Sequence, residues 1–159
     1  PPLHKKSLDS ARVLSDTWGM KRILFSNPTS HLKASAGLLV LRIVFGLGMA
    51  VGHGWGKLMT FGEKMNGFQD PLGIGSPLSL GGAVFSELVC GILIAVGLCT
   101  RVAAVPLIFT MGVAAFLIHE GDPLFGPGPS KEMALLYLSA YLVILMTGPG
   151  KFSIDDKVL

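Results

Sequence analysis

The chain has 159 residues, of which 50% are hydrophobic and only 14% are charged. Because globular proteins average about 25% charged residues, this composition excludes an ordinary soluble domain and indicates a protein of the lipid bilayer. The net charge is +3, but nucleic-acid binding requires Lys and Arg clustered on one solvated face. Here the basic residues gather at the N-terminal end and beside apolar segments, so we expect no nucleic-acid partner.

Residues 1–34 form a polar N-terminal segment rich in basic residues. These are Lys5, Lys6, Arg12, Lys21, Arg22 and Lys33. Because the first long apolar run begins only after this segment, we expect no cleavable signal sequence and interpret the segment as a basic cytoplasmic tail. The alternative is a weakly amphipathic segment that lies along the membrane surface.

Four apolar stretches follow, each close to the ~20 residues with which a helix crosses a bilayer. They are residues 35–56, 78–98, 102–118 and 133–147. Loops rich in Gly and Pro follow the first and third stretches, whereas three residues alone, 99–101, connect the second to the third. The predicted fold is therefore an all-α, four-helix transmembrane bundle over residues 35–156, followed by a short tail at 157–159.

The distribution of basic residues predicts the orientation of this bundle. One side carries the N-terminal segment together with Arg101, Lys151 and Lys157, and the other side carries Lys57, Lys64 and Lys131. Since cytoplasmic segments carry the excess of Lys and Arg, we expect both termini in the cytoplasm or its organellar equivalent.

Small residues in the spans predict how the helices pack. Gly48, Gly52 and Gly56 recur every four residues in the first span, which favours the close approach of a neighbouring helix. Pro106 lies inside the third span, where it is expected to kink the helix or free a backbone carbonyl.

Two charged residues lie deep within the predicted spans. Arg42 lies about seven residues into the first span and Glu87 about nine residues into the second, which runs in the opposite direction. With a rise of ~1.5 Å per residue, both charges are expected at similar depths, so we predict a buried Arg42–Glu87 ion pair. Such a pair is either a functional site or a structural contact that sets helix register.

Further ionisable residues extend this predicted polar site toward the outer surface. His53 and Lys57 lie on the same face of the first helix as Arg42, and His119 ends the third span. Histidines and carboxylates at one depth are typical of a proton relay or a metal site, although interfacial solvation explains them as well. Their spacing is not that of a metal motif, and we expect no metal.

Several motifs together resemble those of the DoxX-like family of membrane proteins. The motifs are the first-helix runs at 37–46 and 53–58, the second-helix runs at 87–93 and 97–101, and the C-terminal run at 148–155. The resemblance extends over about residues 35–156. It implies a four-helix membrane fold, a bacterial inner membrane and an association with redox processes, because the family includes the membrane subunit of thiosulfate:quinone oxidoreductase.

The leading hypothesis is therefore a quinone- or quinol-interacting redox component. Arg42, Glu87 and His53 are the candidate catalytic residues, and the candidate quinone-binding residues are Arg42, His53, Lys57, Glu87 and His119. Quinone chemistry needs proton donors within a non-aqueous pocket. No haem, flavin or iron–sulfur centre is expected, since the sequence has no dinucleotide fingerprint, cysteine cluster or mid-membrane haem pair.

Two other functions stay open. One is a non-catalytic accessory or assembly subunit of a larger membrane complex, such as a respiratory one, and the other is a small transporter. The resemblance is compatible with a subunit of a quinone-linked oxidoreductase and leaves open whether this chain is an enzyme. The lipid bilayer, other subunits of a membrane complex and further copies of the chain are the expected partners.

Overall fold

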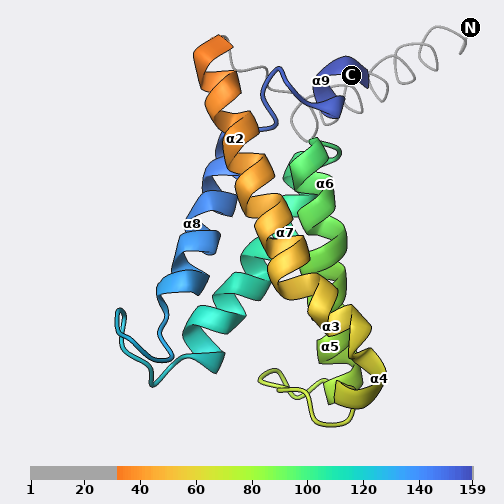
Figure 1. Cartoon of the computed structure of the whole chain (residues 1–159), viewed down its shortest axis with the longest axis vertical. Helices are drawn as coiled ribbons and strands as arrows, with labels where there is room; N and C mark the ends of the chain where they lie inside the picture. Colours follow the sequence, from red (N-terminus) through yellow and green to blue (C-terminus); the bar gives the residue numbers. More distant parts are fainter. Residues whose placement is uncertain (1–31, 159) are drawn as a thin grey trace, which may run out of the picture.

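The computed structural model describes residues 32–158, and every regular element within that range is a helix (Figure 1). The predicted N-terminal tail lies outside the described residues, apart from its last three positions. The helical elements, in chain order, are α2 (Leu32–Met49), η1 (Ala50–Gly54), α3 (Trp55–Met59), α4 (Phe61–Lys64), α5 (Ser76–Val84), η2 (Phe85–Cys90), α6 (Gly91–Val96), α7 (Thr100–Val113), η3 (Ala114–Ile118), α8 (Glu132–Thr147) and α9 (Ile154–Val158).

These elements join into four long helical stretches. Three of them, Leu32–Met59, Ser76–Val96 and Thr100–Ile118, are long and apolar enough to cross a membrane, and the shorter apolar helix α8 has 16 residues. The four predicted spans are thus confirmed as helices, with ends that differ by three residues or fewer. Within the described range, the all-helical membrane bundle expected from the sequence is what the chain forms.

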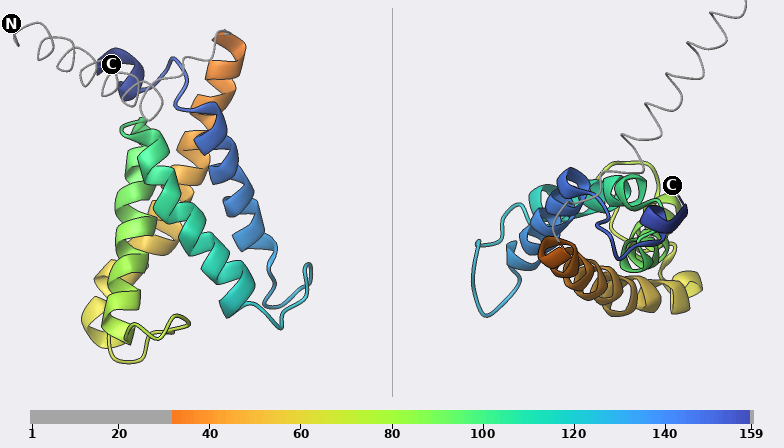
Figure 2. Two further views of the ribbon diagram at one scale, coloured as in Figure 1. Left: turned by 180° about the vertical axis from the view of Figure 1, so that it is seen from behind. Right: turned by 90° about the horizontal axis from the view of Figure 1, so that it is seen from above.

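The four stretches lie close together at one end of the molecule and diverge toward the other (Figures 1 and 2). The start of α2 and the final helix α9 lie at the close-packed end, which we call the C-terminal end. The long loops at residues 65–75 and 119–131 lie at the opposite end, which we call the loop end. Helix α2 packs along α6, and α7 packs along α8. The bundle is therefore wider at the loop end.

Two glycines of the first stretch allow its close contact with the second. A Cβ atom at Gly46 would lie 2.7 Å from the carbonyl oxygen of Gly91, and one at Gly54 would lie 2.6 Å from the amide nitrogen of Leu88. Both contacts are with backbone atoms, which cannot move aside as a flexible side chain can. Glycine at these positions is therefore what lets the two backbones approach.

The prediction that Gly48, Gly52 and Gly56 all lie against a neighbouring helix is wrong for Gly52 and Gly56. A Cβ at Gly52 or Gly56 would meet no described atom within 4 Å, whereas one at Gly48 would lie 2.8 Å from the hydroxyl of Tyr137. Small residues recur every four positions on two faces of this helix. Hydropathy does not distinguish these faces, because lipid and a neighbouring helix are both apolar.

A buried core joins the four stretches between the C-terminal end and the middle of the bundle. It includes Met49, Ile94, Leu107, Tyr141 and Ile144. The hydroxyl of Tyr141 donates a hydrogen bond to the carbonyl oxygen of Phe45 at 3.1 Å, so that this buried polar group is satisfied. The core thus holds α8 against α2 where the stretches are closest.

The segment after α8 folds back over the turn between α6 and α7. Asp155, which is buried, accepts hydrogen bonds from the amides of Cys99 and Thr100 at 2.7 and 2.9 Å and from the Thr100 hydroxyl at 2.8 Å. Its own amide donates to the carbonyl of Gly97 at 2.9 Å. A carboxylate in this position caps the N-terminus of α7 and complements the helix dipole.

The first prediction concerns the close contact of α2 with α6. Gly46→Ala is expected to lower the free energy of unfolding by about 1–3 kcal/mol, because the added methyl group overlaps the backbone of Gly91. Gly52→Ala is the matched control and is expected to leave stability unchanged or raise it by up to about 1 kcal/mol. Thermal unfolding in detergent measures both variants, and equal effects would contradict the assignment.

The second prediction concerns the C-terminal cap. Asp155→Ala removes three hydrogen-bond acceptor contacts at the start of α7 and is expected to destabilise the protein by about 1–3 kcal/mol. Asp156→Ala, at the exposed neighbouring position, is expected to stay within about 0.5 kcal/mol of wild type. The same thermal measurement applies, and a stable Asp155→Ala protein would show that the cap is dispensable.

Candidate functional site

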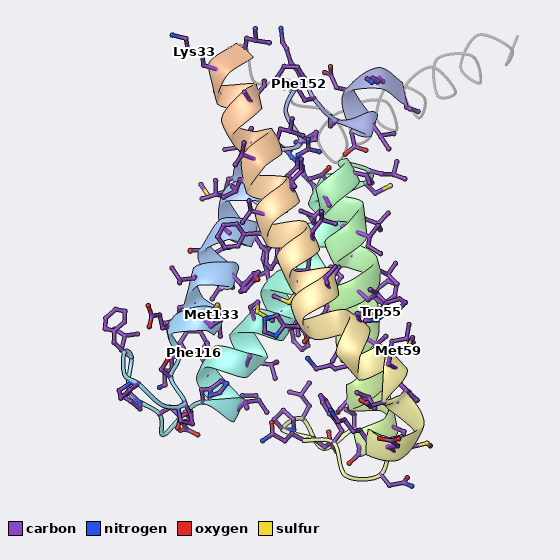
Figure 3. All side chains as sticks on the ribbon, in the orientation of Figure 1. Lys33, Trp55, Met59, Phe116, Met133 and Phe152 are labelled. Carbon is purple, nitrogen blue, oxygen red and sulfur yellow. The ribbon has the colours of Figure 1, made fainter. Side chains whose placement is uncertain are left out.

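A cavity of about 520 Å³ lies in the wider half of the bundle. All four helical stretches contribute to its wall, and the first long loop covers part of it with Phe68, Gln69, Pro71, Leu72 and Ile74. In Figure 3, Trp55 and Met59 of α3 lie on the opposite side of this half from Met133 of α8. The wall is largely apolar with a few polar groups, which is typical of a small-molecule site.

Four of the five predicted site residues line this cavity: His53, Lys57, Glu87 and His119. The central pair is Lys57 and Glu87, whose Nζ and Oε2 atoms are 2.5 Å apart. The Glu87 side chain is 6% exposed and that of Lys57 is 23% exposed, so both charges are largely withdrawn from solvent. Since an unpaired charge inside a membrane helix costs several kcal/mol, this ion pair stabilises both charges at the cavity wall.

The predicted ion pair between Arg42 and Glu87 is therefore wrong. The Arg42 side chain is fully buried at the C-terminal end, where it donates a hydrogen bond to the carbonyl of Phe152. It lies against Gly97, where an added Cβ would overlap the guanidinium group. Gly97 is ten residues beyond Glu87 along the second stretch, a separation of about 15 Å.

Arg42 and Glu87 lie at different depths because the helix ends are not level, whereas similar depths would require both helices to begin at the membrane surface. Instead, α2 projects beyond the turn between α6 and α7, as Figure 1 shows. This stagger places Arg42 level with the end of α6, and Arg42 is not among the described residues that line the cavity.

An aromatic cluster borders the cavity on the side of α8. The rings of His53 and Tyr137 meet edge to face, with centroids 5.8 Å apart and planes at 84°. Tyr137 also contacts Phe45 and Tyr141, with centroid separations of 5.3 and 6.0 Å. Tyr137 was not among the predicted site residues. The available signal was that both tyrosines of the chain lie four residues apart on one face of an apolar helix.

Two polar contacts complete the described wall. The Thr110 hydroxyl donates to Ser86 Oγ at 2.9 Å, which joins η2 to α7 across the cavity wall. His119 Nδ1 lies 2.7 Å from Asp122 Oδ2 in the loop after η3. Within residues 32–158, no group of three or more His, Cys, Asp or Glu side chains lies close enough together to hold a metal ion.

Three π-helical segments surround the cavity. His53 belongs to η1 and Glu87 to η2, and His119 directly follows η3, with its amide bonded to the carbonyl of Ala114 five residues earlier. Such segments are rare in proteins overall, but those that occur are often found at functional sites, because the extra residue redirects the side chains around it. Their gathering at one cavity therefore supports this cavity as the functional site.

Residues 37–120, just over half of the chain, match the family model described as DoxX. The chain belongs to the DoxX family. An uncharacterized protein of Haemophilus influenzae is 35% identical over 123 residues, which cover 76% of this chain and 89% of the relative. The inner membrane protein YqjF of Escherichia coli is 31% identical over 126 residues, which cover 75% of this chain and 89% of the relative.

A third relative, an uncharacterized membrane protein of Mycobacterium tuberculosis, is 30% identical over 143 residues that cover 80% of this chain and 85% of the relative. No solved structure gives a significant match. Together with the apolar helices, these relatives identify the chain as a DoxX-family membrane protein. The matched range 37–120 contains all five predicted site residues, whereas Tyr137 and the C-terminal cap lie beyond it.

In this DoxX-family protein, a hydrogen-bonded turn holds the first long loop against the cavity. Asp70 accepts hydrogen bonds from the amides of Ile74 and Gly75 at 3.1 and 2.7 Å and from the Ser79 hydroxyl at 2.7 Å. The Ser79 hydroxyl, followed by the Gly75 amide, holds the pKa of Asp70 below its ordinary value. The ionised carboxylate therefore ties the loop to the start of α5.

The third prediction follows from this lowered pKa. The contribution of Asp70 to loop stability is fully present above its ordinary unfolded-state pKa and is lost as the pH falls through the lowered folded-state pKa. At neutral pH, Asp70→Ala is expected to exchange the Gly75 amide hydrogen faster than wild type does, and the difference is expected to disappear in acid. Glu63→Ala, at an exposed position of α4, is the control. Equal exchange rates at neutral pH would contradict this role.

Proposed function

We propose that this membrane protein is a quinone- or quinol-interacting redox component, with the head group of the ligand bound in the cavity. The observation that carries the proposal is the convergence of the Lys57–Glu87 ion pair and His53 on one largely apolar cavity. A volume of about 520 Å³ lies within the range of small-molecule sites. Arg42 is assigned a structural role instead, because it lies at the C-terminal end.

The polar groups of the cavity suit the two oxygen atoms of a quinone ring. A quinone carbonyl accepts hydrogen bonds, and its reduction to the quinol takes up two electrons and two protons. The Lys57 ammonium group is a hydrogen-bond donor, and the His53 imidazole and Glu87 carboxyl groups exchange protons. We assign the electrons to a partner subunit or to a reduced substrate that meets the quinone in the cavity.

The proposed orientation places the loop end on the outer side of a bacterial inner membrane, with both termini in the cytoplasm. The excess of Lys and Arg at the other end supports this orientation, as does the relative that is named an inner membrane protein. His119 lines the cavity and is paired with Asp122 in the loop that follows. Protons then exchange with the outer aqueous phase through His119.

The fourth prediction tests the head-group site directly. Glu87→Gln removes the charge that positions Lys57, so the affinity of the purified full chain for decylubiquinone is expected to fall about tenfold or more. Glu132→Gln, at an exposed position outside the cavity lining, is the matched control and is expected to bind like wild type. Native mass spectrometry after mild extraction measures the bound quinone and any accompanying subunits.

A second variant separates loss of the site from loss of folding. The double change Lys57→Met with Glu87→Leu replaces the ion pair by apolar side chains, and such exchanges are often neutral or stabilising. It is expected to stay folded and to bind decylubiquinone as weakly as Glu87→Gln. Unchanged binding in both variants, or a wild-type protein that binds no quinone and stays in a large complex, would overturn the proposal in favour of an accessory subunit.

A further inference from the structure

Two aromatic residues of the cavity wall also lie on the outer surface of the bundle. Phe85 of η2 is 54% exposed and Phe109 of α7 is 60% exposed, yet both line the cavity. A side chain that borders both the cavity and the exterior forms the rim of an opening. The rim therefore lies between the second and third helical stretches.

This rim lies at mid-membrane depth. Measured from the turn at the C-terminal end, Phe85 precedes the end of α6 by about 17 Å and Phe109 follows the start of α7 by about 14 Å. The hydrocarbon core is about 30 Å thick, so both rings lie near its centre. The opening consequently faces lipid tails rather than water. In the left view of Figure 2, α5 and the loop end of α7 diverge on this side.

Small residues leave room between the rim and the polar groups inside. Gly82 and Ala83 of α5 and Pro106 of α7 line the cavity beside the rim. A Cβ atom at Gly82 would meet no described atom within 4 Å, so the space in front of it is open. The charged pair Lys57–Glu87 lines the same cavity and is less exposed than the rim side chains. The cavity thus combines a largely buried charged pair with an apolar rim that opens to the bilayer.

We propose that the ligand is dissolved in the membrane and enters sideways between α5–η2 and α7, with an apolar tail that remains in this opening. A polar head at Lys57–Glu87 and a tail past Phe85 and Phe109 match the charged pair and the apolar rim of the cavity. The route between Phe85 and Phe109 opens to a membrane-dissolved molecule, because both rings lie in the hydrocarbon core. The inference rests on the proposed function for the head group alone, and the tail is tested separately.

The test uses Gly82→Phe to fill the opening. Because a Cβ atom at Gly82 meets no described atom within 4 Å, a larger side chain can start there without displacing backbone atoms. Gly81→Phe is the matched control, since a Cβ at Gly81 also meets no described atom within 4 Å and Gly81 is not among the cavity-lining residues. Gly82→Leu, with a smaller side chain, is a second blocking variant if Gly82→Phe does not fold.

The probe is a fatty acid with a photoreactive diazirine on its chain, added to the full protein in lipid nanodiscs. Labelling is read by mass spectrometry at Ser86 and Met111, which line the cavity and are shielded from the surrounding lipid. Wild type and Gly81→Phe are expected to be labelled at both residues. Gly82→Phe is expected to lower this labelling about tenfold, since a misfitting group in an apolar pocket changes binding to that extent or more.

The outcomes separate the two proposals. Equal labelling in Gly82→Phe and Gly81→Phe, or no labelling of Ser86 and Met111 in wild type, overturns the lateral opening, whatever quinone does. Loss of labelling in Gly82→Phe, but not in Gly81→Phe, supports the opening even if decylubiquinone does not bind. In that case only the quinone proposal is contradicted. In a parallel titration, decylubiquinone affinity is expected to fall in Gly82→Phe, whereas the affinity for tail-free tetramethylbenzoquinone is expected to stay within about twofold.

Discussion

The energetic cost of a charge inside an apolar helix is the constraint on which the candidate site depends. An unpaired charge near the centre of a bilayer costs at least about 2.5–3.5 kcal/mol. Glu87 meets this constraint through Lys57, which approaches it from the end of the first helical stretch. The pair therefore ties α3 to η2, and it keeps two charged groups at the cavity wall.

Arg42 meets the same constraint at the other end of the bundle. Its guanidinium group donates one hydrogen bond to the carbonyl of Phe152 and is attracted by the charge of Asp155, both from the segment after α8. Its buried Nε and Nη1 atoms have no hydrogen-bond partner among the described residues. Asp155 also caps α7, so one short segment fastens α2 and α7 together. The bundle is thus joined at the C-terminal end and wide at the loop end, and the cavity occupies the wide half.

The shape of the cavity connects the two proposals. Its wall holds the ion pair and His53, and its apolar rim opens at mid-membrane depth between Phe85 and Phe109. A lipid-soluble molecule with a polar head and an apolar tail fits this polarity, and quinones are one such class. The three π-helical segments place the polar side chains without breaking the apolar helices that carry them.

Hydropathy along the chain determined the four helices, because the transfer of apolar residues into lipid is a local property that adds up over about 20 residues. It also selected His53, Lys57, Glu87 and His119, since charged and histidine side chains stand out in apolar spans. The pairing of these residues was decided by the tertiary structure. Lys57 rather than Arg42 meets Glu87 because α2 is staggered against α6, and this stagger depends on the fit of Gly46 and Gly54 against the second helix. The spacing of Tyr137 and Tyr141 marks one face of the last helix in the sequence, but many apolar faces look alike, so the sequence could predict neither the stagger nor which face borders the cavity.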